Sequence, residues 1–186
     1  MSPIRPLSGY VHPMALTARP GFCRPWAWLA ALSIASISAS LVVKPPLLFV
    51  WNVSPSVSRG LYFVEHSGTI RRGGFVIARL PQPARSIAAE RHYIPSNIPL
   101  VKQVAAVAGD RVCTRGNRVR IGDRLTVLRL RKDQAGRPLP WWTGCRTLLK
   151  REFLLLGSDR SSFDGRYFGP TRLSSIEGRA VPVWTR

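Results

Sequence analysis

Three segments of the chain carry side chains that could perform acyl-transfer chemistry. The first is the turn Ser54-Pro55-Ser56, where two hydroxyls stand shortly before an apolar stretch. The second is Lys102, a single amine inside the apolar run 100–107. The third is the loop 157–170, which gathers hydroxyls, two acids and two bases after another apolar run. A serine is a weak nucleophile until a base takes its proton, and burial can keep a lysine amine neutral enough to be that base.

Each segment also has a plain structural explanation. Ser, Pro and Gly favour turns, so residues 52–62 alone predict only a turn. Lys102 alone could point outward from an alternating strand, and the loop around Asp164 could be an ion-pair loop that serves the fold. The functional hypothesis therefore depends on the three segments occurring together and in this order.

The composition favours a mostly β domain with a short appendage. A chain of 186 residues suits one domain, and 16 Pro and 15 Gly predict many turns and argue against a helical bundle. After residue 50, short apolar runs alternate with turn signals and no long stretch has a helical period. Residues 82–97 are expected to form a polar surface loop, with one helical turn as an alternative. The expected strands are 61–64, 75–80, 100–107, 118–121, 125–130, 153–156 and 180–184.

The apolar segment 25–43 predicts a membrane anchor. It has 19 residues without a charge, and a bilayer core of about 30 Å needs roughly 20 such residues in a helix. Three arginines precede the segment and no acid occurs before Glu65, which places residues 1–24 in the cytoplasm and 44–186 beyond the membrane.

Two other interpretations of this segment stay open. It could be a signal peptide cleaved near Ala39, or a buried core helix. Four serines make it only moderately hydrophobic. Met14 is an alternative start, because a signal peptide usually begins with a short basic region. The domain organisation expected here is a cytoplasmic segment 1–24, an anchor or signal peptide 25–43, and a periplasmic domain 44–186.

The net charge and the residue spacings limit which partners, metals and cofactors we expect. The chain has 28 Lys and Arg against 9 Asp and Glu, a net charge of +19. Its bases are dispersed and no nucleic-acid motif occurs, so we expect anionic lipid rather than nucleic acid at the basic surface. Cysteine and histidine spacings match no zinc pattern, and no glycine-rich phosphate loop occurs, so no metal and no cofactor are expected.

Cys113 and Cys145 are the two cysteines of residues 44–186. Such a pair could form a disulfide in an oxidising compartment, worth about 3–4 kcal/mol in the chain-entropy model. Two unlinked thiols are the alternative.

In this order the motifs resemble the signal peptidase I superfamily. Its members carry Ser-x-Ser after the anchor, then a lysine in an apolar strand before Gly-Asp, here Gly109-Asp110, then a loop like 162–166 here. The segments 56–62, 136–140, 162–170 and 181–185 are further similar to conjugative-transfer peptidases of the TraF type. The resemblance implies a β-barrel or sheet catalytic domain, and maturation of a pilin precursor, in some systems with joining of the pilin ends into a circle.

Four features depart from the family pattern. Ser58 stands where these proteins often have Pro, and Ser158 replaces an Asp. The final loop is one residue shorter than in signal peptidase I, and the chain has one apolar segment where many signal peptidases have two.

The expected mechanism assigns a role to each motif residue. Lys102 deprotonates Ser56, whose hydroxyl attacks the scissile carbonyl, as in other Ser–Lys variants of the triad. The Ser56 backbone N–H and the Ser54 hydroxyl hold the oxyanion. Ser162 orients the lysine amine, and Asp164 and Arg166 pair to hold their loop.

A histidine-based triad would instead need His66 or His92 with Asp110 or Asp164.

The predicted function is that of a membrane-associated serine endopeptidase that processes a conjugative pilin precursor. Its predicted location is the bacterial inner membrane with the catalytic domain in the periplasm, or the periplasm if the apolar segment is cleaved. Other conjugation-apparatus proteins are further expected partners. The rival functions are a general signal peptidase I, a non-enzymatic basic assembly component of the transfer apparatus, and a cytosolic autoprotease.

Overall fold

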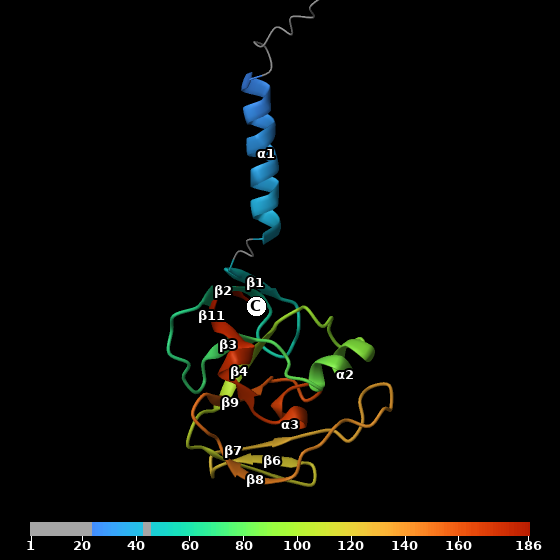
Figure 1. The fold of residues 1–186 in the computed structure, drawn as a ribbon. Coiled ribbons are helices and arrows are strands. Elements are labelled where there is room, and N and C mark those ends of the chain that lie inside the picture. Colours follow the sequence, from blue (N-terminus) through green and yellow to red (C-terminus); the bar gives the residue numbers. More distant parts are fainter. Residues whose placement is uncertain (1–23, 43–45) are drawn as a thin grey trace, which may run out of the picture. The chain divides into compact units, whose positions relative to one another are not determined.

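The computed structural model describes residues 24–42 and 46–186, which divide into two units near Pro46 (Figure 1). The first unit contributes helix α1 (Arg24–Val42), which covers nearly the whole segment predicted as an anchor. Over the described residues, no helix has both the length and the apolar character needed to cross a membrane, so the expected transmembrane helix is not confirmed. The expectations for residues 1–23, including the alternative start at Met14, lie outside the described residues.

A seven-stranded antiparallel sheet forms the larger part of the second unit. Its strand order is β1-β2-β11-β3-β4-β9-β10. The longest strand, β11, pairs with β2 along one edge and with β3 along the other, so it joins the two parts of the sheet. The strands are β1 (Phe49–Asn52), β2 (Gly60–Glu65), β3 (Phe75–Ala78), β4 (Leu100–Ala106), β9 (Glu152–Leu156), β10 (Thr171–Arg172) and β11 (Ile176–Thr185).

A smaller antiparallel sheet has the order β7-β6-β5-β8. Cys113 on β5 lies directly opposite Cys145 on β8, and the two form a disulfide. The strands of this sheet are β5 (Arg111–Arg115), β6 (Arg118–Ile121), β7 (Leu125–Leu128) and β8 (Gly144–Thr147). The remaining elements are α2 (Ala84–Glu90), α3 (Gly165–Phe168) and the 3-10 turn η1 (Leu173–Ser175).

A shared apolar core joins the two sheets. Val112, Val119 and Ile121 of the small sheet pack with Leu154 and Leu156 of β9. Fully burying one such side chain contributes about 1.5–3 kcal/mol, so the small sheet is held against β9 by apolar burial as well as by the chain connections.

The mostly β expectation is confirmed, with corrections of detail. Every expected strand overlaps one in the structure, but β1, β5, β8 and β10 were not predicted. Residues 84–90, expected within a polar loop, form a seven-residue helix because Ala84 and Ala88, four residues apart, both pack inward. The strands form two sheets with free edges, such as β1 and β7, rather than one closed barrel.

Candidate active site

The turn that carries the predicted nucleophile is held by a buried asparagine. Asn52 ends β1, and its side-chain amide donates hydrogen bonds to the carbonyl oxygens of Ser54 (2.9 Å), Val57 (3.2 Å) and Ser58 (3.1 Å). Its own oxygen accepts from the Ser54 N–H at 3.2 Å. One side chain therefore fixes the backbone on both sides of Ser56 before the chain enters β2.

The two hydroxyls of the turn bond to each other. Ser56 is buried, and the Ser54 hydroxyl donates to Ser56 Oγ at 3.0 Å. The Ser56 N–H donates to Ser54 Oγ at 3.2 Å. The two groups predicted to hold an oxyanion are thus side by side, and in this structure each satisfies the other.

Strand β4 places Lys102 inside the protein. Two adjacent residues of the strand, Val101 and Lys102, are both buried, so the strand is covered on both faces and the alternative of an outward lysine is wrong. The Lys102 Nζ donates to Ser162 Oγ at 2.6 Å. Burial lowers the pKa of Lys102 to about 8, opposed by the carboxylates of Asp164 and Asp159 and reinforced by Arg166.

Gly157 brings the serine turn and the lysine together. A Cβ atom at this position would lie 2.4 Å from Ser162 Oγ and 2.8 Å from Ser56 Cβ. Both serines therefore flank the same small space, and Lys102 bonds to one of them. The next residue ties the two segments together, because the Ser158 N–H donates to the Ser56 carbonyl at 2.7 Å and its hydroxyl donates there at 3.1 Å.

A buried ion pair shapes the loop that carries Ser162. Asp164 accepts from the backbone N–H groups of Gly157 (2.7 Å) and Arg166 (3.0 Å), and Arg166 Nε lies 3.2 Å from its carboxylate. The Arg166 guanidinium also donates to the carbonyls of Gly157 and Arg160. Burial raises the pKa of Asp164, opposed by the nearby Arg166 and Lys102. The ion pair and its hydrogen bonds thus hold the two ends of the loop 157–166 together.

The histidine alternative finds no support in the geometry. Asp110 bonds with Arg72 and Arg124, and Asp164 with the groups above. His92 contacts the Ala89 carbonyl. Within the described part of the chain, no hydrogen bond joins a histidine to either carboxylate, and no cluster of three metal-ligating side chains occurs.

Three residues of the site were not found by sequence reasoning. Asn52 and Ser158 hold the backbone around Ser56, and an Asn two residues before a Ser-Pro-Ser turn is a signal that could have identified the first. Arg129 is buried and donates to the carbonyls of Gly116, Trp142 and Arg166, with its guanidinium 4.2 Å from the Trp141 ring centroid. An arginine among apolar residues gives no sequence sign of such a role.

These buried serines and the buried lysine occur in a chain whose sequence matches a peptidase family. The chain belongs to the signal peptidase family, peptidase S26, whose sequence profile matches residues 24–185. It is 35% identical over 145 residues to the plasmid transfer protein TraF of Escherichia coli, covering 72% of this chain and 81% of that protein. It is 32% identical, with the same coverage, to the conjugal transfer protein TraF of Agrobacterium fabrum.

Among solved structures, a signal peptidase I from Enterococcus faecalis matches with a TM-score of 0.35 and 18% identity, covering 60% of this chain and 97% of that one.

Proposed function

We propose that this chain is a Ser–Lys endopeptidase that matures the precursor of a conjugative pilin. The observation that carries the proposal is the buried Lys102, whose pKa is lowered to about 8, beside the space that Ser56 and Ser162 share at Gly157. A lysine that loses its proton this close to neutral pH is a usable general base.

The proposed reaction begins when Lys102 Nζ takes the proton of Ser56 Oγ. The oxygen then attacks the scissile carbonyl carbon, a C–O bond forms, and the carbonyl oxygen becomes an oxyanion. In the structure Lys102 bonds to Ser162, so we propose that bound substrate brings the amine and Ser56 into contact while Ser162 keeps the amine oriented. Catalytic hydrogen bonds often become short only when substrate is bound.

Ser54 and the Ser56 N–H are the proposed oxyanion donors. Without substrate the Ser54 hydroxyl donates to Ser56 Oγ and the Ser56 N–H donates to Ser54 Oγ, so the developing oxyanion replaces these two hydrogen bonds with two bonds to itself. A donor of this kind is typically worth about 3–4 kcal/mol in the transition state. The C–N bond then breaks, and the leaving amine takes the proton from Lys102.

The acyl-enzyme can react further in two ways. Water, deprotonated by Lys102, gives a free carboxyl end. The amino end of the same pilin chain, attacking the same ester carbon, gives a peptide bond and a circular product. Both routes restore the Ser56 hydroxyl and balance without any cofactor.

An exposed aromatic face supports a membrane location for this reaction. Phe49 and Trp51 on β1, Phe63 on β2 and Trp184 on β11 form this aromatic face. The Phe49 and Phe63 ring centroids are 5.5 Å apart, and those of Trp51 and Trp184 are 5.6 Å apart.

Exposed aromatic patches of this kind commonly contact a membrane or a partner. We propose that the aromatic face lies on the periplasmic surface of the inner membrane. It is continuous with the turn that holds Ser56, which would then meet a precursor anchored in the bilayer.

The test is processing of the co-expressed pilin precursor in membranes, read by mass spectrometry. We expect Ser56→Ala and Lys102→Ala to lower the processing rate by roughly 10³-fold or more. Ser67→Ala and Lys150→Ala, which alter exposed residues of the same types, should process as well as the wild type. A product lighter by one further water identifies the circular form.

Two other results would favour the rival functions. Processing that survives both active-site substitutions would contradict the peptidase and favour a non-enzymatic assembly role. Rescue of a strain depleted of its own signal peptidase, without any action on the pilin, would identify a general signal peptidase, which the family assignment also fits.

A further inference from the structure

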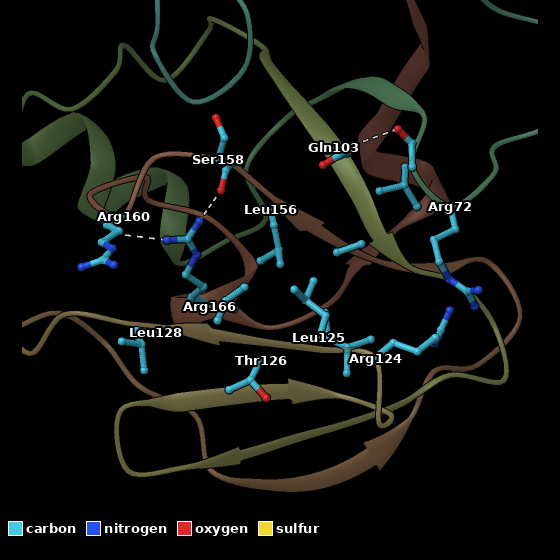
Figure 2. A pocket seen from close by; sticks show the side chains of 16 residues that line it. Arg72, Gln103, Arg124, Leu125, Thr126, Leu128, Leu156, Ser158, Arg160 and Arg166 are labelled. Atoms are coloured by element: carbon cyan, nitrogen blue, oxygen red, sulfur yellow. Dashed lines mark hydrogen bonds between the residues drawn. The ribbon is translucent and has the colours of Figure 1, made fainter.

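A cavity of about 590 Å³ lies between the two sheets (Figure 2). Its walls come from β4 and β9 of the large sheet and from β7 of the small sheet. Leu125 and Leu156 contribute apolar surface between its two ends. The volume falls in the range of roughly 300–1,000 Å³ that ligand sites occupy.

The charged side chains that line the cavity are all arginines. Arg72 and Arg124 stand at one end, and Arg160 and Arg166 at the other, as Figure 2 shows. No Asp or Glu occurs among the described residues that line it.

Nearby carboxylates neutralise only part of this charge. Asp110 is shared by Arg72 and Arg124, so that end keeps one positive charge. Asp164 neutralises Arg166. The exposed Arg160 side chain has no ion pair within the described part of the chain. Asp159, next to Arg160, also lies near Arg166 and Lys102 and reduces the net positive charge at that end. The charged side chains that line the cavity itself are nevertheless four arginines, so the cavity favours an anionic occupant.

The cavity borders the proposed active site. Gly157 and Ser158 line it; a Cβ atom at Gly157 would meet the Ser56 side chain, and the Ser158 hydroxyl donates to the Ser56 carbonyl. Gln103 also lines it and directly follows Lys102. A polypeptide whose carbonyl lies at Ser56 can thus continue past Ser158 into the cavity.

One wall of the cavity suits an extended peptide. All four residues of β7 line it, and β7 is the edge strand of the small sheet. An edge strand presents unpaired backbone groups that can pair with another extended chain. Leu125 and Leu128 on β7 are exposed, so apolar side chains that alternate with acidic ones could also be accommodated.

We propose that this cavity binds an acidic segment of the substrate polypeptide, carrying Asp or Glu side chains, beside the bond that Ser56 attacks. The inference rests on the proposed peptidase function and adds a substrate class to it. Arg160 and Arg124 recognise the carboxylates, and β7 holds the peptide backbone.

The test profiles cleavage of a proteome-derived peptide library by the full chain in detergent. We expect Asp and Glu to be enriched on one side of the cleaved bonds, and the enrichment to disappear in Arg160→Glu. For a peptide chosen from the profile, kcat/KM should fall roughly tenfold in Arg160→Glu, with a much smaller change for its Gln counterpart. Arg118→Glu is the matched control, because Arg118 is an exposed arginine on β6 outside the cavity.

A binding measurement separates this inference from the proposed function. The inactive Ser56→Ala chain is mixed with a labelled peptide of alternating Glu and Val, or with its Gln counterpart. We expect the Glu peptide to bind more tightly, and adding Arg160→Glu to remove the difference. This result would support the acidic site even if no Ser56-dependent cleavage occurred, an outcome that would overturn the peptidase proposal alone.

Three results would overturn the inference itself. One is Ser56-dependent cleavage without enrichment of acidic residues. Another is equal loss in Arg118→Glu and Arg160→Glu, which would indicate long-range charge attraction. The third is Arg160-dependent binding to anionic lipid vesicles with no preference for the Glu peptide, which would assign the arginines to lipid headgroups.

Discussion

Two carboxylates bind arginines at opposite ends of the cavity between the sheets, and their surroundings differ. The Asp164 side chain is 0% exposed and Arg166 is 4% exposed. Asp110 is 13% exposed, and its partners Arg72 and Arg124 are 43% and 49% exposed. The same pairing of residue types thus occurs in the interior beside the proposed active site and, at the other end, between a largely buried carboxylate and two exposed arginines.

Because of this difference, the two ion pairs contribute differently to the structure. At the surface, water and salt screen the charges, and the pair contributes little. In the interior both charges lose hydration, so the pair persists only with further hydrogen bonds. Asp164 and Arg166 have them from and to the backbone of Gly157, Arg160 and Arg166. Their effect is to fix the position of the loop beside Lys102.

The comparison is tested most directly by removing each carboxylate charge. We expect Asp164→Asn to lower the free energy of unfolding by about 3–5 kcal/mol, because it leaves the Arg166 charge buried without a partner. Asp110→Asn should cost less, because the arginines that it leaves without a carboxylate are 43% and 49% exposed and stay hydrated. Urea unfolding of the full chain measures both, and equal losses would show that burial does not distinguish the pairs.

The disulfide tests whether the small-sheet end acts independently of the catalytic end. Replacing Cys113 and Cys145 by serine should lower stability by about 3–4 kcal/mol in the chain-entropy model. Processing activity should persist under conditions where the variant stays folded, because the small sheet carries none of the Ser–Lys groups. A loss of activity without unfolding would show that the two ends are coupled.

Replacing Lys102 should raise the free energy of unfolding, whereas the two preceding replacements lower it. The folded pKa of about 8 lies below the ordinary 10.5, so the charged amine destabilises the fold fully below pH 8. This cost disappears as the pH rises toward about 10.5. We expect Lys102→Met to raise the free energy of unfolding by up to about 3 kcal/mol at pH 7 and by much less at pH 10. Lys150→Met, at an exposed position, should show no such gain.

The smallest expected effect is the pH dependence of the rate. Since the reaction needs neutral Lys102, kcat/KM should rise about tenfold per pH unit below pH 8 and level off above it. Asp110→Asn, at the other end of the cavity, should leave this profile in place. A rate that stays constant from pH 6 to 9 would contradict the role of Lys102 as the base.

Much of the fold was predictable because apolar residues on the central strands lie between turn signals. Leu154, Leu155 and Leu156 are all buried, and such a run indicates a covered strand. Among the missed strands, β8 lacks this contrast, because it is exposed at every residue and is held by pairing with β5 rather than by its own burial. Pairing partners far apart in the sequence leave no local pattern.

The site residues also divide into those that a local sequence pattern reveals and those that depend on distant partners. Ser56, Lys102 and Ser162 were found because their types and order match a chemical requirement. Asn52, Ser158 and Arg129 act on backbone carbonyls, and any segment of the chain can present a carbonyl. Their roles depend on which backbone lies within reach, which only the three-dimensional structure gives.

The place of β11 has a consequence for shortened forms of the chain. The segment that carries Ser56 precedes β2, Lys102 lies on β4 next to β3, and β11 is the strand that joins β2 to β3. A nascent chain still lacking residues 176–185 has both groups but lacks the strand that pairs with both β2 and β3. A chain shortened before residue 176 should therefore hold the proposed nucleophile and base together less firmly than the full chain.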